Sequence, residues 1–139
     1  MTTDEITHNS PEGIRGAQAV AAAIFLNRTG SSKEDIRSYI EKTFGYNLHR
    51  TTDEIRPTYR KEYTCDKSVP ESIICFLEGT GYMDTVVRAI SLGGDTDTMA
   101  CIAGNIAAAT MPVPEDVALD CYNKLPQELR EIFNAWNNK

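Results

Sequence analysis

Apolar residues recur at helical spacing through most of this chain, and the clearest example lies near the amino terminus. There the apolar side chains lie three and four residues apart and share one helix face, at Ile14, Ala17, Ala21, Ile24 and Phe25. Ser10-Pro11-Glu12 is a typical helix start, with a serine cap, proline at the first helical position and then an acid. Gly30 supplies a stop, so the pattern predicts a helix that runs to about Arg28.

The other periodic segments predict further helices in one domain of residues 1–139. Ser31 with Glu34, and Ser68 with Glu71, form capping boxes that predict two helix starts. The segments are 31–44, 68–79, 83–91, 97–110, 115–123 and 127–136. Residues 46–67 show little periodicity and predict a long loop. No trustworthy strand alternation is present, so the class is all-α, a compact helical bundle.

Composition narrows the possible partners and the compartment. The net charge of −6 argues against a general nucleic-acid surface, because binding phosphates needs clustered Lys and Arg. No apolar run is long enough for a membrane span, and residues 1–9 do not resemble a signal peptide. The four cysteines are widely spaced, which argues against zinc and against a disulfide framework. We therefore expect a cytoplasmic protein with reduced thiols, with Cys75 and Cys101 in the core.

The strongest candidate for a functional site is the segment Gly93-Gly94-Asp95-Thr96-Asp97-Thr98, which comes directly before a predicted helix of small residues. Two glycines allow a sharp turn, and Asp95 is placed to cap the helix that follows. Asp95, Asp97 and Thr98 can direct oxygens at one point, an arrangement that suits Mg²⁺. The plain alternative is a well-capped buried helix. A cap needs only one acid, however, and two close carboxylates repel unless a cation lies between them.

Two related motifs do not fit. An EF-hand loop needs an oxygen ligand at its fifth position, glycine at its sixth and glutamate at its twelfth. The chain has Met99, Ala100 and Ile106 there. The phosphatase pattern Asp-x-Asp-x-Thr needs threonine where Met99 stands. A bare phosphate cradle is also disfavoured, since Asp95 and Asp97 would repel phosphate without a bridging metal.

The segment Gly93–Thr98, with the small residues after it, resembles the carboxy-terminal metal motif of the ADP-ribosylglycohydrolase family. Thr7-His8, ahead of the alanine-rich helix, is similar to the family's Thr-His segment, and Ser68-Val69-Pro70-Glu71 resembles its bacterial members. The resemblance covers almost the whole chain, from about His8 to the last helices. It implies an all-α bundle that hydrolyses an N- or O-glycosidic bond to ADP-ribose.

The resemblance also implies a set of site residues. Asp95, Asp97 and Thr98 would ligate a binuclear Mg²⁺ centre, with Mn²⁺ as a substitute, and the two aspartates would carry the catalysis. His8, Gly93 and Gly94 would line the substrate site. For His8, an exposed or capping residue near a helix start is an equal alternative; His49 lies in the loop with no motif around it and is expected on the surface.

The chain departs from the family pattern in one respect. The family's second metal motif, a Thr-Asp-Asp run in its amino-terminal half, is absent from this sequence, which therefore corresponds to the carboxy-terminal half. A partial bundle exposes apolar surface, so we expect a homo-oligomer or a complement to a missing half. The substrate would be an ADP-ribosylated protein or small molecule. The alternative function is a non-catalytic module that binds Mg²⁺ or ADP-ribose, or a helical interaction protein.

Overall fold

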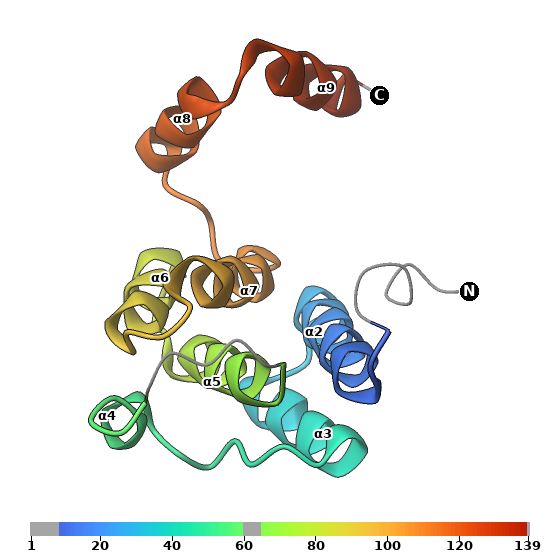
Figure 1. The fold of residues 1–139 in the computed structure, drawn as a ribbon. Coiled ribbons are helices and arrows are strands. Elements are labelled where there is room, and N and C mark those ends of the chain that lie inside the picture. The colour runs from blue at the N-terminus through green and yellow to red at the C-terminus, as the bar shows by residue number, and fades with distance from the viewer. Residues whose placement is uncertain (1–8, 60–64, 139) are drawn as a thin grey trace.

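The computed structural model describes residues 9–59 and 65–138, and every regular element in this part of the chain is a helix (Figure 1). The all-α prediction is confirmed. The helices are α2 (Pro11–Arg28), α3 (Lys33–Phe44), α4 (Thr52–Ile55), α5 (Cys65–Glu78), α6 (Tyr82–Ser91), α7 (Thr96–Ala108), α8 (Glu115–Lys124) and α9 (Gln127–Asn137). None of these described helices has the length and apolar character that crossing a membrane requires.

The first two helix starts rest on serine caps. Ser10 Oγ accepts a hydrogen bond from the Gly13 backbone N–H at 3.0 Å, as the sequence predicts. The cap of α3 is Ser32, whose Oγ accepts from the Asp35 N–H at 3.1 Å. The capping box predicted at Ser31 is therefore wrong by one residue, because Ser32 and Asp35 offer an equivalent cap one position later.

The predicted loop over residues 46–67 is shorter than expected. It contains α4, which begins with a capping box between Thr51 and Glu54. Helix α5 begins at Cys65, so Ser68 is not its cap but lies inside the helix, where its carbonyl accepts from Ser72 Oγ at 2.6 Å. Pro70 is also internal, which removes one backbone hydrogen bond. The capping-box pattern predicted the helix but placed its start one turn too late.

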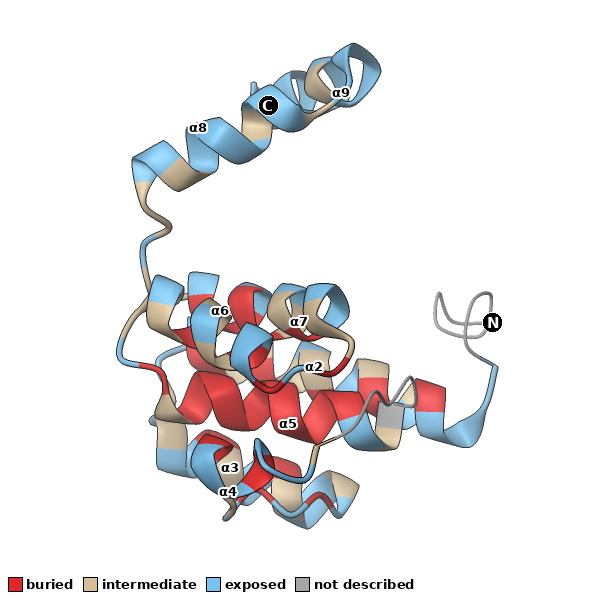
Figure 2. Ribbon diagram, turned by 60° about the vertical axis from the view of Figure 1, so that its left-hand side comes forward, coloured by how far each residue is buried: buried red, intermediate tan, exposed pale blue. Residues whose placement is uncertain are grey.

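Helix α5 forms the centre of the bundle, and α2, α6 and α7 pack around it (Figure 2). Its core side chains are completely or almost completely buried, and they are Ile73, Ile74, Cys75, Phe76 and Leu77. The prediction that Cys75 belongs to the core is confirmed. Cys101 is exposed, so that prediction is wrong.

Small residues let α7 pack closely against its neighbours. Ala103, Gly104 and Ala107 are buried, and a methyl group at Gly104 would lie 3.4 Å from Tyr82 and Val86 of α6. The Asn27 side chain of α2 donates to the Ile106 carbonyl at 2.8 Å. Helix α7 is thereby fixed by α6 on one side and by α2 on another.

Helices α8 and α9 extend away from this bundle (Figure 1). Both were predicted from their apolar spacing, and their bounds agree with the prediction to within a residue. Neither contains a buried residue, and Figure 2 shows both as exposed along most of their length. The sequence analysis predicted both helices as part of one compact bundle, whereas the structure shows them as a separate arm.

Candidate metal centre

The acidic turn, which we define as residues 93–98, connects α6 to α7. Gly93 has φ of 75°, a left-handed conformation that favours glycine. Gly94 is buried, and a Cβ atom there would lie only 2.1 Å from Cε1 of the Tyr59 ring. The first glycine thus makes the turn, and the second lets an aromatic ring from another segment lie directly against the backbone.

The two aspartates of the turn interact with each other. Asp95 holds the position before α7, but its side chain makes no capping hydrogen bond. The pKa of Asp97 is lowered, first by the neighbouring Asp95 side chain and then by the Thr98 backbone N–H, which donates to Asp97 Oδ1 at 3.0 Å. Two ionised carboxylates this close in the chain repel each other, and a cation beside both would offset that repulsion.

The oxygens of the turn are accessible. Asp97 and Thr98 are exposed and Asp95 is half-buried, so a hydrated cation can reach all three side chains. Mg²⁺ keeps several waters and takes one or two carboxylates from a protein, which is what this donor set offers. The residues therefore fit one divalent cation.

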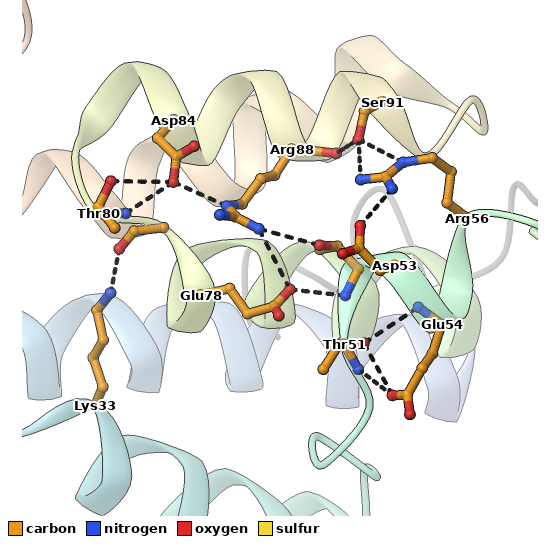
Figure 3. Close-up of polar contacts among 12 residues, drawn as sticks. Lys33, Thr51, Asp53, Glu54, Arg56, Glu78, Thr80, Asp84, Arg88 and Ser91 are labelled. Carbon is orange, nitrogen blue, oxygen red and sulfur yellow. Dashed lines mark hydrogen bonds and ion pairs between the residues drawn. The ribbon is translucent and has the colours of Figure 1, made fainter.

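Helix α4 supports the turn through a polar network (Figure 3). Arg56 donates to Ser91 Oγ at 3.1 and 3.2 Å, close to the start of the turn. The Thr52 backbone N–H donates to Glu78 Oε2 at 2.7 Å. Arg88 of α6 connects this helix to α4: it donates to Asp84 of α6 at 2.9 Å and to Thr52 Oγ1 of α4 at 3.3 Å. Because α4 carries Tyr59 in the segment that follows it, the network holds the ring against Gly94.

A cavity of about 270 Å³ is lined by Tyr59, the residue whose ring lies against Gly94. Its other lining residues are Arg50, Glu54, Ile55, Thr58, Lys67 and Glu71. Glu71 is only 4% exposed and pairs with Arg50 at 2.7 Å. Burial nevertheless raises the pKa of Glu71, and Arg50 opposes this shift only in part. The cavity is large enough for one chemical group rather than for a whole nucleotide.

Two histidines remain from the sequence analysis. His8 lies outside the described residues. His49 is exposed, as predicted, and its Nε2 lies 3.1 Å from Glu41. Within residues 9–59 and 65–138, no third His, Cys, Asp or Glu joins Asp95 and Asp97 in a group able to hold a metal.

Sequence reasoning missed the residues that support the turn. Tyr59, Arg56 and Arg88 lie outside the motif, and two of them come from a segment with little periodicity. The one signal in the sequence was the second glycine of the Gly-Gly pair, because a glycine that the turn itself does not require can mark a place where another group lies against the backbone. Only the fold identifies the answer as Tyr59.

Comparisons with known proteins agree with the family resemblance. A family model described as ADP-ribosylglycohydrolase matches residues 2–137. The ADP-ribosylarginine hydrolase Tri1 of Pseudomonas putida is 24% identical over 96% of this chain and 39% of its own length. The ADP-ribosylhydrolase ARH3 of Bos taurus is 28% identical over 93% of this chain and 50% of its own length. The chain thus spans half or less of these relatives. No solved structure matches.

Proposed function

The chain belongs to the ADP-ribosylglycohydrolase family, and on this basis we propose that it hydrolyses a glycosidic bond to ADP-ribose with Mg²⁺ held by the acidic turn. Mn²⁺ would serve in its place. The substrate would be an ADP-ribosylated protein or small molecule. The relatives named above are hydrolases of ADP-ribosylated substrates, which supports this class of reaction.

The observation that carries the proposal is the arrangement of the two aspartates. Asp95 stands directly before α7 but its side chain makes no capping hydrogen bond, and it lies close enough to Asp97 to lower the pKa of Asp97. A helix cap alone does not account for two acids at this position, since it would be satisfied by one acid that accepts from the backbone. A divalent cation between them would relieve the repulsion that arises when both ionise.

Each residue of the turn has a distinct proposed role. Asp95 and Asp97 would hold the cation through their carboxylates, and Thr98 would add its hydroxyl oxygen. Gly93 and Gly94 would bring the backbone close to the ribose. A divalent cation there would supply charge to orient the sugar hydroxyls and would lower the pKa of a bound water.

The alternative is a module that binds Mg²⁺ or ADP-ribose without turnover. One observation favours it: within the described residues only two carboxylates converge on the site, whereas the binuclear centre that the resemblance implies needs further ligands. Under this alternative the acidic turn would still bind the ligand, but no glycosidic bond would break.

One experiment separates the two functions. ADP-ribose release from a mono-ADP-ribosylated arginine peptide is measured with Mg²⁺ and then with EDTA, for the wild type, Asp97→Asn and Asp116→Asn. Asp116 is an exposed acid in the first turn of α8, so its variant is the matched control. We expect release that EDTA and Asp97→Asn abolish and that Asp116→Asn leaves unchanged.

A different outcome would identify the binding module. In that case no peptide is cleaved, yet ADP-ribose binds in the presence of Mg²⁺ and binds more weakly to Asp97→Asn. Release that persists in EDTA and in Asp97→Asn would contradict both functions, because each depends on a cation at the turn.

A further inference from the structure

The carboxy-terminal arm, residues 112–138, exposes a large amount of apolar surface. Five large apolar side chains of the arm are about half exposed or more: Leu119 (60%), Leu129 (49%), Ile132 (66%), Phe133 (50%) and Trp136 (75%). The α9 members recur at three- and four-residue spacing and therefore occupy one helix face. Monomeric proteins rarely leave such a contiguous apolar face in water, so the arm has the character of a docking element.

The arm is an organised unit. The Tyr122 and Phe133 rings lie 5.7 Å apart between centroids. The Asn134 side chain donates to the Tyr122 hydroxyl at 2.8 Å. These contacts orient α8 and α9 relative to each other, so their apolar side chains are presented together.

A second exposed apolar stripe runs along α6. Met83, Val87 and Ile90 are 41%, 55% and 51% exposed, and their spacing of four and three residues places them on one face. The opposite face of α6, with Thr85 and Ala89, is buried against the bundle. Helix α6 has ten residues and α9 has eleven, so the two stripes match in length.

The geometry points to a second copy of this chain as the occupant. We propose that the arm of one copy docks its α9 face on the α6 stripe of another copy, while the partner's arm docks in return. The arm extends away from its own bundle (Figure 1), and Pro114 holds an extended backbone with φ −57° and ψ 136° just before α8. Each copy offers both surfaces, so the exchange closes as a two-fold dimer with two identical contacts.

The area available is enough for a modest dimer. Fully buried aromatic side chains account for about 150–250 Å² each, so Phe133 and Trp136, which are 50% and 75% exposed, together offer roughly 200–300 Å². With the five half-exposed aliphatic side chains of the two stripes, two reciprocal contacts cover on the order of 1,000 Å², near the lower limit of specific interfaces. We therefore expect dissociation on the order of micromolar concentrations.

The first test measures the mass in solution across the micromolar range by light scattering after size-exclusion chromatography. The wild type is expected to shift from 15.4 kDa towards twice this mass as concentration rises. Val87→Lys on α6 and Ile132→Lys on α9 are each expected to stay monomeric. Phe25→Lys is the matched control, because Phe25 is 65% exposed on α2 and belongs to neither stripe; this variant is expected to dimerise. Circular dichroism verifies that all the variants fold.

Mixing the two lesions is the decisive step. In a pair made of Val87→Lys and Ile132→Lys, one contact combines an intact arm with an intact stripe, whereas each homodimer has a lesion in both contacts. We expect a tag pull-down to capture more heterodimer from the mixture than homodimer from either variant, because only the heterodimer keeps one intact contact. The proposal would be overturned by a wild type that is monomeric at every concentration, which would indicate that the arm binds a different occupant. Dimers that survive Val87→Lys, which would indicate arm-to-arm contact, would overturn it as well, and so would a mixture that yields no more dimer than either variant alone, which would indicate contact elsewhere.

Discussion

Replacing Gly94 with alanine tests how the acidic turn is held. The added methyl group would lie 2.1 Å from Cε1, 3.0 Å from Cδ1 and 3.1 Å from Cζ of Tyr59. Ordinary carbon contacts are about 3.5–4.0 Å, so the ring or the turn must move by roughly 1.5 Å. Overpacking of this kind costs about 1–3 kcal/mol of unfolding free energy, and the displacement also disturbs Asp95, the next residue.

The assay is thermal and urea unfolding followed by circular dichroism, together with Mg²⁺ titration calorimetry. Gly81→Ala is the control, because a methyl group there meets nothing within 4 Å and its φ of −169° suits any residue. We expect Gly94→Ala to lose about 1–3 kcal/mol and to bind Mg²⁺ more weakly, and Gly81→Ala to change stability by less than about 0.5 kcal/mol.

A double-mutant cycle with Tyr59→Ala isolates the cause. If the ring is what the methyl group meets, the cost of Gly94→Ala should largely disappear once the ring is removed. An equal cost of Gly94→Ala in both backgrounds would refute the reasoning, and so would a cost no larger than that of Gly81→Ala.

Three further outcomes are expected. Burial raises the pKa of the Cys75 thiol to about 12. After treatment with a thiol reagent at pH 8, mass spectrometry should therefore show Cys75 unmodified and the exposed Cys121 modified. Modification of Cys75 ahead of Cys121 would contradict the burial. Phe76→Ala removes a fully buried ring of α5 and should cost about 3–5 kcal/mol by urea unfolding, against which a loss below about 1 kcal/mol would count. Arg88 lowers the pKa of Asp84, so their pair stabilises the protein at neutral pH and this contribution declines as pH falls below about 3.9, the value in unfolded chains. In Arg88→Met that part of the acid dependence of unfolding should vanish, and an unchanged pH profile would contradict the assignment.

The helices could largely be predicted from the sequence because their signals are local. Ser10 and the apolar spacing after it fix α2, and the same type of pattern gives α6, α8 and α9 within one or two residues. The errors came where two local signals compete. At Ser31 a second serine offers the same cap one residue later, and at Ser68 a capping pattern lies inside a helix whose burial outweighs the loss at Pro70.

What local patterns could not give is the relation between distant segments. The position of Tyr59 against Gly94 depends on α4 being held by Glu78 and Arg88, and no spacing rule connects these residues. The extended arm is a second example, because the apolar stripe of α9 predicts that it packs but not on which surface. Cys101 shows the same limit, since the face of α7 that is buried depends on where α6 and α5 lie.

The central claim is that the acidic turn binds a divalent cation, and Mg²⁺ titration by isothermal calorimetry tests it most directly. The wild type and Asp116→Asn should bind Mg²⁺ alike, and Mn²⁺ should compete for the same site. Asp97→Asn removes one of the two carboxylates and should abolish binding or weaken it at least tenfold, which corresponds to about 1.4 kcal/mol. Equal Mg²⁺ binding by the wild type and Asp97→Asn, or no binding by the wild type at millimolar Mg²⁺, would contradict the claim.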